Sequence, residues 1–191
     1  YSFAALKTDG SVVTWGIKTY GGDPTTLSTQ LSSGVKTLYA TEMDFAALKT
    51  DGTVVCWGHT AGYDFNNRIP TVSSQLTPGV ARIYSNKSCF AALKTNGGVV
   101  TWGDTAKGGN SSSVSGDIQA GIANVYSTGT AFAALNLSGK VVTWGDAADG
   151  GDSSSVSAKI QAGISRVYSN RLAFAALDNS GRVITWGNAA S

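Results

Sequence analysis

Two short apolar runs separated by a polar turn recur along this chain and predict its main elements. The first copy covers residues 3–16 and reads F-A-A-L-K-T-D-G-S-V-V-T-W-G, and four more copies follow with few changes. The copies begin at Phe3, Phe45, Phe90, Phe132 and Phe174, so successive starts lie 42, 45, 42 and 42 residues apart. A period in this range is typical of a propeller or a solenoid, in which one supersecondary unit is repeated.

Each copy has the pattern of a β-hairpin whose two strands are covered on both faces. The turn always ends in glycine, which supplies the positive φ that tight hairpin turns demand: Gly10, Gly52, Gly97, Gly139 and Gly181. Within residues 3–6, Phe and the second Ala share one strand face, while the first Ala and Leu share the other. Neither face is polar, as expected for strands that are stacked between two neighbours in a propeller.

A third strand is expected before every hairpin except the first. Segments such as G-V-K-T-L-Y end in a tyrosine six residues before the Phe, at Tyr39, Tyr84, Tyr126 and Tyr168, whereas Tyr1 is only two residues before Phe3. We therefore predict an all-β fold, a single tandem-repeat β-propeller domain over residues 1–191 with units starting near 1, 34, 79, 121 and 163. The first unit lacks its first strand, so we expect the chain to be part of a longer chain or larger assembly.

The connectors between units carry turn signals. After Trp-Gly, three of them contain a Gly-Gly pair followed by Asp or Asn, at residues 21–23, 108–110 and 150–152, which favours an Asx turn. The segment that follows, such as residues 153–160, fits either a fourth edge strand or a helical turn.

The repeated unit resembles that of the regulator of chromosome condensation repeat family. The matching features are an alanine-leucine strand, a turn glycine, a strand ending in Trp-Gly and a glycine-rich elbow, here Ala5-Leu6, Gly10, Trp15-Gly16 and Gly21-Gly22 with their counterparts. The resemblance implies a β-propeller of the short-repeat type, and family members are usually seven-bladed. Seven units at this period need about 294 residues, so the resemblance implies either an arc of a ring or a five-unit ring that lacks one connector.

This sequence departs from the family at two points that bear on function. The family's Gly-Gln-Leu-Gly elbow is only Gly-Gly-Asp here, and the Gly-His pair that precedes the Ala-Leu strand is missing. The resemblance therefore supplies a fold and no functional residue.

Composition excludes several classes of protein. With 42% hydrophobic and 14% charged residues, the chain is globular, and a net charge of +2 is too small to indicate binding to nucleic acid or to an anionic membrane. No run of 18 apolar residues is present, so we expect no membrane span.

Departures from the repeat mark the candidate binding residues. The second connector is three residues longer than the others and carries the single histidine, His59, together with Tyr63, Phe65 and Arg68. These residue types are enriched at protein interfaces, although a drifted loop that packs its own aromatic side chains would show the same pattern. The loops that precede each Phe also differ among units and add these candidates: Glu42, Asp44, Lys87 and Arg171.

No arrangement of residues indicates catalysis, a metal or a cofactor, and we predict that the chain is not an enzyme. His59 has no cluster of acidic residues or cysteines beside it, and the aspartates that recur with the repeat period come one per unit instead of as paired carboxylates. The five tryptophans could serve as stacking platforms, but their strict periodicity indicates core residues: Trp15, Trp57, Trp102, Trp144 and Trp186.

Three further features concern covalent chemistry and compartment. Cys56 and Cys89 come from adjacent units and either form a disulfide or remain as two buried thiols. Glycosylation sequons begin at Asn86, Asn110 and Asn136. The sequons favour a secreted or surface-exposed location for the protein.

Two classes of function remain open, and a third has less support. The first is a structural or protein-binding scaffold that presents variable loops on a rigid frame, with a protein as its partner. The resemblance alone adds a guanine-nucleotide exchange or chromatin-associated factor. A sugar-binding propeller would repeat an aromatic residue in the connectors, and the sequence does not repeat one there.

Overall fold

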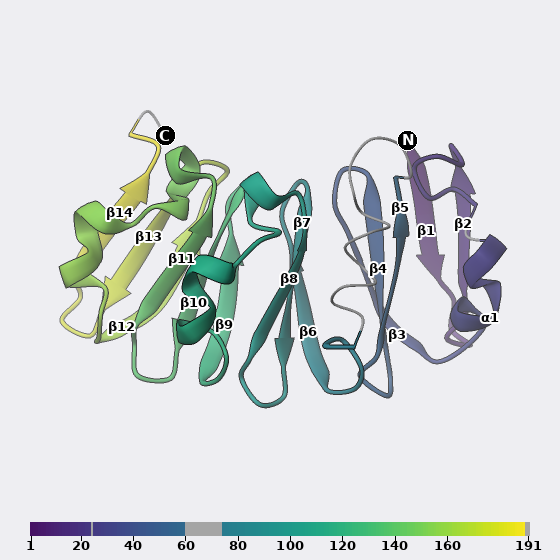
Figure 1. Cartoon of the computed structure of the whole chain (residues 1–191), viewed down its shortest axis with the longest axis horizontal. Coiled ribbons are helices and arrows are strands. Elements are labelled where there is room, and N and C mark those ends of the chain that lie inside the picture. Colours follow the sequence, from purple (N-terminus) through teal and green to yellow (C-terminus); the bar gives the residue numbers. More distant parts are fainter. Residues whose placement is uncertain (24, 60–73, 190–191) are drawn as a thin grey trace.

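The chain folds as five consecutive antiparallel β-sheets arranged side by side (Figure 1). The computed structural model describes residues 1–23, 25–59 and 74–189. The first sheet has two strands and each later sheet has three, in the order in which the chain forms them. The strands are β1 (Ser2–Leu6) and β2 (Val12–Gly16); β3 (Val35–Ala40), β4 (Asp44–Lys49) and β5 (Val54–Gly58); β6 (Val80–Ser85), β7 (Cys89–Lys94) and β8 (Val99–Gly103); β9 (Ile122–Ser127), β10 (Ala131–Asn136) and β11 (Val141–Gly145); and β12 (Ile164–Ser169), β13 (Ala173–Asp178) and β14 (Val183–Gly187).

The structure confirms the predicted all-β class and the hairpin in every unit. In each hairpin the Phe is paired with the Trp, as Phe132 is with Trp144 in β10 and β11. The two-stranded first sheet also agrees with the prediction that the first unit lacks its first strand.

The connectors contain short helical turns. These are η1 (Thr25–Leu27), α1 (Ser28–Leu31), η2 (Thr105–Lys107), η3 (Ser112–Asp117), η4 (Ala147–Gly151) and η5 (Ser154–Lys159). Of the two alternatives for residues 153–160, the helical turn is therefore correct. The predicted Asx turn precedes it, because Oδ1 of Asp152 accepts a hydrogen bond from the amide of Ser154.

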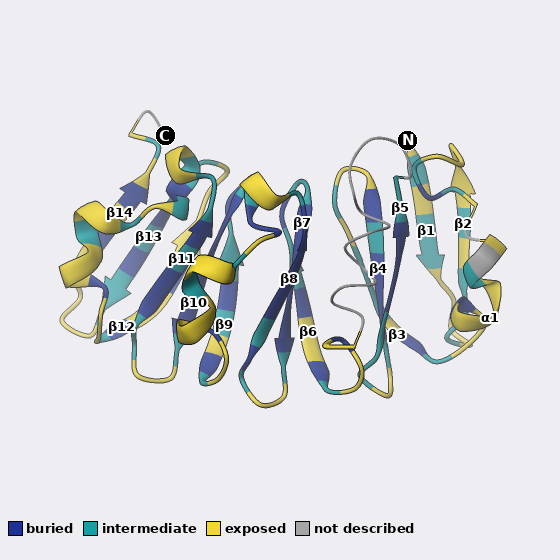
Figure 2. Cartoon of the chain, viewed as in Figure 1, coloured by how far each residue is buried: buried dark blue, intermediate teal, exposed yellow. Residues whose placement is uncertain are grey.

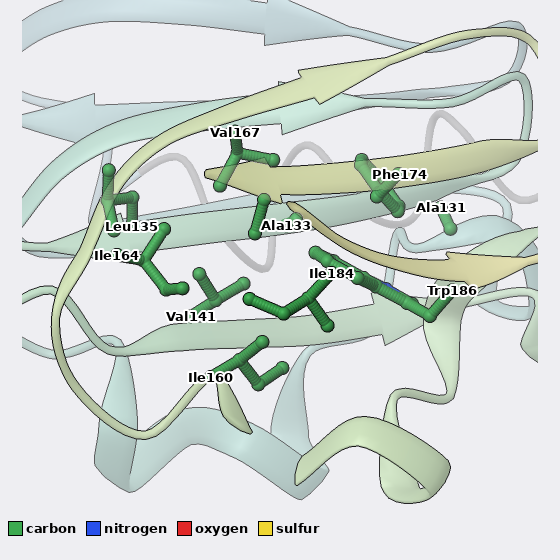
Figure 3. Packing of buried hydrophobic residues seen from close by; sticks show 11 residues of the cluster. Ala131, Ala133, Leu135, Val141, Ile160, Ile164, Val167, Phe174, Ile184 and Trp186 are labelled. Carbon is green, nitrogen blue, oxygen red and sulfur yellow. The ribbon is translucent and has the colours of Figure 1, made fainter. Parts of the chain in front are cut away.

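Successive units share their apolar cores, so that the core lies between sheets (Figures 2 and 3). Each hairpin has a tail face, formed by the first Ala, the Leu and the first Val, and a head face, formed by the Phe, the second Ala, the next Val or Ile and the Trp. The tail face of the fourth unit, with Ala133, Leu135 and Val141, packs against the head face of the fifth, with Ile184 and Trp186. The same pairing joins the other neighbouring units.

The five units form an open arc, with the first and the last at its opposite ends (Figure 1). Among the described residues, no other unit packs against the head face of the first unit or the tail face of the last unit. This arrangement corrects one prediction about the tryptophans. Trp57, Trp102, Trp144 and Trp186 are buried, but Trp15 is 51% exposed, because none of the other four units packs on its head face.

Backbone hydrogen bonds also join the units at the hairpin turns. The carbonyl oxygen of Gly97, in the turn of the third unit, accepts a hydrogen bond of 2.9 Å from the amide of Ile122 in the fourth. Gly97 has φ of 78°, and a Cβ there would lie 2.6 Å from the amide nitrogen of Gly121. Glycine is thus required by both the turn and the close approach of the next unit.

Candidate protein-binding surface

In each complete unit, the side chain of the first residue of the loop between the first and second strands accepts hydrogen bonds from amides later in that loop. Oδ1 of Asn86 accepts hydrogen bonds from the amides of Ser88 (2.9 Å) and Cys89 (2.8 Å). Oγ1 of Thr128 accepts one from the amide of Ala131 in the same way. A Thr or Asn stands four residues before the Phe in every complete unit and is the sequence signal for this loop: Thr41, Asn86, Thr128 and Asn170.

The four loops are hydrogen-bonded to one another in a continuous line. The amide of Glu42 donates a hydrogen bond to the carbonyl oxygen of Lys87 (3.0 Å), and the amide of Lys87 donates one to the carbonyl oxygen of Gly129 (3.2 Å). The amide of Gly129 in turn donates to the carbonyl oxygen of Arg171 (2.7 Å). We call these four residues the loop row. The row lies at the edge of the arc where both chain ends lie, because Leu172 accepts a hydrogen bond from Asn188 and β1 begins at this edge (Figure 1).

The loop row carries charged side chains on a rigid backbone. Nζ of Lys87 lies 3.9 Å from Oε1 of Glu42, and both Glu42 and Arg171 are exposed. A side chain at position 129 would crowd its neighbours, since a Cβ there would lie 3.1 Å from the carbonyl oxygen of Arg171 and 3.4 Å from Cε of Lys87. The row therefore presents one acidic and two basic groups in a fixed order.

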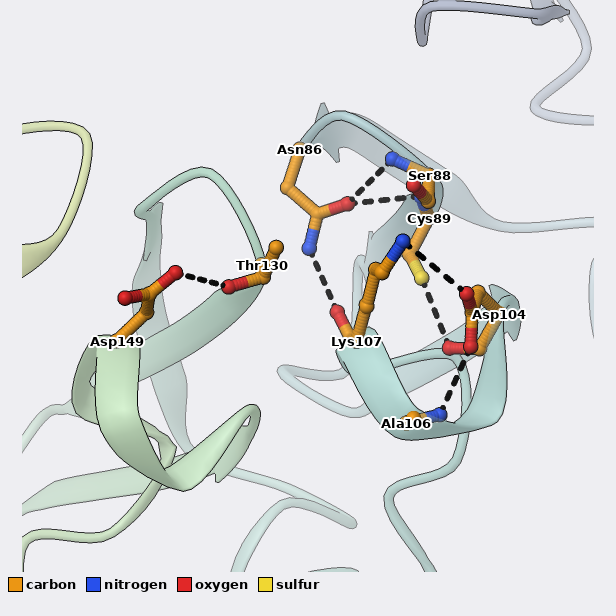
Figure 4. A network of polar contacts seen from close by, with 8 residues as sticks. All are labelled: Asn86, Ser88, Cys89, Asp104, Ala106, Lys107, Thr130 and Asp149. Atoms are coloured by element: carbon orange, nitrogen blue, oxygen red, sulfur yellow. Dashed lines mark hydrogen bonds and ion pairs between the residues drawn. The ribbon is translucent and has the colours of Figure 1, made fainter.

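The first turn of a connector packs beside each of the two middle loops (Figure 4). Nδ2 of Asn86 donates to the carbonyl oxygen of Lys107 (2.7 Å), and Oγ1 of Thr130 donates to Oδ2 of Asp149 (2.7 Å). The turn beside Asn86 is η2, and it begins at Asp104. Oδ1 of Asp104 accepts a hydrogen bond from the amide of Ala106, and its Oδ2 lies 3.5 Å from Nζ of Lys107. The loops and the connector turns thus form one polar surface.

The structure brings together three of the predicted loop residues and corrects the fourth. Glu42, Lys87 and Arg171 all belong to the loop row. Asp44 does not face solvent: it is 7% exposed, and its Oδ1 accepts a hydrogen bond of 2.8 Å from the amide of His59. Burial raises the pKa of this carboxyl group above its ordinary value. Asp44 therefore holds the start of the second connector and contributes no binding group to the surface.

His59 also has a structural setting. Its ring stacks on that of Tyr20, with centroids 5.1 Å apart, and Tyr20 stacks on Tyr1 at 5.0 Å. The other three candidates of the second connector, Tyr63, Phe65 and Arg68, lie outside the described residues.

Both cysteines are buried free thiols, so the predicted disulfide alternative is wrong. The side chain of Cys56 packs at the interface of the second and third units, and that of Cys89 at the interface of the third and fourth. Sγ of Cys89 donates to the carbonyl oxygen of Asp104 (3.1 Å). Burial raises the pKa of the Cys89 thiol to about 12 and raises that of Cys56 as well.

The three sequons differ in their surroundings. Asn86 is buried and its Nδ2 donates to Lys107, so its amide closes a loop and is not a free acceptor for a glycan. Asn110 is exposed and Asn136 is half-buried. Glycosylation at these two positions stays a prediction.

Within the described ranges 1–23, 25–59 and 74–189, no three His, Cys, Asp or Glu side chains form a group that could hold a metal ion. No helix there has the length and apolar character needed to cross a membrane.

Comparison with solved structures identifies the fold. No family model matches the chain, and no curated protein matches it either. Human WBSCR16 matches with a TM-score of 0.55 and 18% identity, over 97% of this chain and 59% of that one. Yeast RCC1 (Prp20), solved with Kap60 bound, matches with a TM-score of 0.58 and 17% identity over 97% and 54%. The ectodomain of the Physcomitrella patens receptor kinase CR4 matches with 0.58 and 17% over 97% and 49%.

At these identities the likeness establishes the fold alone, and this chain spans about half to three fifths of the length of those proteins. The hairpin units, their order and their shared cores agree with that fold along nearly the whole chain. The chain has the fold of an RCC1-like repeat β-propeller, as its repeat motif predicts.

Proposed function

We propose that the chain is a non-enzymatic scaffold that binds a protein partner through the loop row and the connector turns beside it. The observation that carries the proposal is the hydrogen-bonded line through Glu42, Lys87, Gly129 and Arg171. Four loops of different sequence are held in one register by their backbones, so variation in their side chains changes the surface without changing the frame. Such a preorganised surface loses little conformational entropy on binding.

The charges of the row suit a polar protein surface better than a small molecule. Glu42 and Arg171 are exposed at the two ends of the row and carry opposite charge. Complementary charges across an interface fix its register and speed association. We expect the partner to present a basic group toward Glu42 and acidic groups toward Lys87 and Arg171.

The solved neighbours support a binding role in a coarse way. One of them was solved with Kap60 bound, and the same yeast protein was studied for its binding to Gsp1p and histones. Those partners belong to that protein. An exchange or chromatin-associated role for this chain rests on likeness of fold, which by itself implies no activity.

A sugar-binding role has less support from the described connectors. The position five residues after the Trp holds Tyr20, Lys107 and Asp149 in three of them, so it repeats no aromatic ring. The tryptophans of the later units are stacked on phenylalanines inside the shared cores, as Trp144 is on Phe132, with centroids 5.5 Å apart.

The experiment that tests the proposal reverses the charges of the row. A photo-cross-linking residue at position 42 captures the partner from the native source, and the same capture is repeated in the double variant Lys87→Glu with Arg171→Glu. The matched control is Lys36→Glu with Lys159→Glu, which changes net charge equally at two exposed lysines away from the row. We expect capture to be lost in the row variant and kept in the control. Equal capture by both variants would place binding elsewhere.

A further inference from the structure

The first strands of units two to five run beside one another along the inner side of the arc. β3, β6, β9 and β12 contact each other in that order, whereas the third strands of the described units make no comparable contact with one another. Side chains also join these strands. The hydroxyl of Tyr84 on β6 donates to Oδ1 of Asn124 on β9 (3.0 Å), and Oγ of Ser127 on β9 donates to the carbonyl oxygen of Ser85 on β6 (2.9 Å). The sheets therefore converge on an inner face that is built from their first strands.

One position of this inner face carries a hydrogen-bond donor in three consecutive units. Arg82, Asn124 and Arg166 occupy the third position of β6, β9 and β12, with 42 residues from each to the next. The side chain of Arg82 is exposed although a further unit packs on each side of its own, and Asn124 is half-buried. We call these three residues the donor line.

The donor line carries positive charge and donors that have no counterpart within the described chain. No Asp or Glu occurs in β3, β6, β9 or β12. The ion pairs of the described residues use other basic groups, such as Arg182 with Asp178, and give no acidic partner to Arg82 or Arg166. Because Oδ1 of Asn124 accepts the hydrogen bond from Tyr84, the group that Asn124 offers to a ligand is its Nδ2 donor.

This chemistry favours carboxylates over nucleic acid. Arginine and amide N–H groups pair well with carboxylate oxygens, and a guanidinium binds a carboxylate through two hydrogen bonds. Single-stranded nucleic acid is held largely by stacking of bases on aromatic rings. The tyrosines beside the donor line are partly buried against the apolar cores between units, as Tyr84 and Tyr126 are, so they do not form a platform for bases.

We infer that the inner face binds an extended acidic segment of a protein across the donor line. Stacked sheets lie about 10 Å apart and an extended chain advances about 3.3 Å per residue, so Arg82 and Arg166, two units apart, suit acidic side chains about six residues apart. Nδ2 of Asn124 donates to the segment between them. Charge complementarity selects this occupant, and the inference does not depend on what the loop row binds.

The experiment titrates the isolated chain with octaglutamate, which presents carboxylates at every spacing up to seven residues. Binding is followed by NMR through the backbone amides of β6, β9 and β12 and through the Nδ2 protons of Asn124. At low salt we expect octaglutamate to shift these signals with a Kd below about 1 mM, and octaglutamine to shift none of them. An octathymidylate strand, which carries phosphates in place of carboxylates, should bind at least about tenfold more weakly.

A matched pair of variants tests whether the donor line is the site. Asn124→Asp keeps the acceptor for the hydroxyl of Tyr84 and replaces the Nδ2 donor by a negative charge. Asn110→Asp makes the same change in net charge on an exposed connector residue, at the position that Asp152 occupies in the next connector. We expect Asn124→Asp to weaken octaglutamate binding at least about tenfold and Asn110→Asp to weaken it less than about twofold.

Three outcomes contradict the inference. One is the absence of any shift in the first strands at about 1 mM octaglutamate. Another is equal affinity for octaglutamate and octathymidylate, which points to a general polyanion or nucleic-acid surface. The third is an equal loss of affinity in Asn124→Asp and Asn110→Asp, with melting temperatures that show both variants to be folded. Because the isolated chain meets a synthetic peptide, each result stands whether or not the loop row captures a partner.

Discussion

Nε1 of Trp186 donates a hydrogen bond of 3.1 Å to the carbonyl oxygen of Gly150, which lies in the connector that enters the same unit. Trp144 and Gly108 repeat this contact one unit earlier, also at 3.1 Å. Each of these connectors thus closes over the Phe–Trp pair of the unit that it enters. The contact makes the two directions along the arc inequivalent, because the tryptophan of a unit is hydrogen-bonded to the connector that precedes that unit.

Truncation of the tryptophans should reveal this direction. Trp144→Ala removes a buried indole and its hydrogen bond, and we expect it to cost about 3–5 kcal/mol of the free energy of unfolding. Trp15→Ala removes a half-exposed ring that stacks only on Phe3 among the described aromatic rings, and should cost about 1 kcal/mol. Denaturant melts of both variants check this, and equal costs would contradict the direction of the arc.

The elbow glycine should be intolerant of a side chain. Gly150 has φ of 99°, and a Cβ there would lie 2.6 Å from Cδ2 of Phe174. We expect Gly150→Ala to cost at least about 2 kcal/mol, from backbone strain and from displacement of the ring. Gly116→Ala is the control, because nothing lies within 4 Å of its Cβ position, and it should leave the melting temperature unchanged or higher. A similar loss in both variants would show that the elbow contact is not the cause.

The buried carboxyl group of Asp44 should make stability fall as pH rises. Burial raises its pKa above 3.8, so the unfolded chain loses this proton more readily, and the stability due to protonated Asp44 is lost as pH rises from about 3.8 through the raised pKa. Asp44→Asn keeps the acceptor for the amide of His59 and removes the charge. Relative to wild type, this variant should gain stability between pH 4 and pH 7 in thermal melts.

Asp51 provides the control of opposite sign. It is exposed, and hydrogen bonds from the amide and hydroxyl of Thr53 lower its pKa. Its stabilising effect is therefore present above about 3.8 and lost as pH falls through the lowered pKa, so relative to wild type Asp51→Asn should lose stability as pH rises toward about 3.8 and should change little between pH 4 and pH 7. If the stability of both variants relative to wild type changes in the same direction as pH rises, the burial of Asp44 does not control the pH dependence of stability.

The two thiols should be silent in the folded protein. Both are buried and burial raises the pKa of each, so little thiolate is present at pH 8. We expect Ellman's reagent to label neither Cys56 nor Cys89 until denaturant is added, and two thiols afterwards. Rapid labelling of the native chain, or a mass that indicates a disulfide, would disagree with the shared cores.

Much of the fold was accessible from the sequence because the repeat is nearly exact. The period predicted the five units, the turn glycines predicted the hairpins, and the short spacing from Tyr1 to Phe3 predicted the two-stranded first sheet. The sequence did not tell which neighbour each apolar face meets, since both faces are equally apolar. That is why Trp15 was expected in the core.

The candidate surface was predicted only in part. Variation among the loops pointed to Glu42, Lys87 and Arg171, but the hydrogen bonds that align them are made by backbone atoms, which leave no mark on side-chain identity. Asp44 looked like its neighbours because burial of a single carboxyl group depends on the amide of His59, fifteen residues away. Gly129 carries no side chain, so variation in the loop side chains did not predict its place in the loop row.

The most direct test of the loop row is the exchange rate of its backbone amides. The amides of Glu42, Lys87 and Gly129 donate to the next unit, whereas among the described residues none accepts a hydrogen bond from the amide of Arg171. Hydrogen–deuterium exchange of the isolated chain, followed residue by residue by NMR, should therefore find the first three amides strongly protected and the amide of Arg171 exchanging at the rate of an open loop. Rapid exchange at all four positions would contradict the account, because the loops would then move independently and would not form a single preorganised surface.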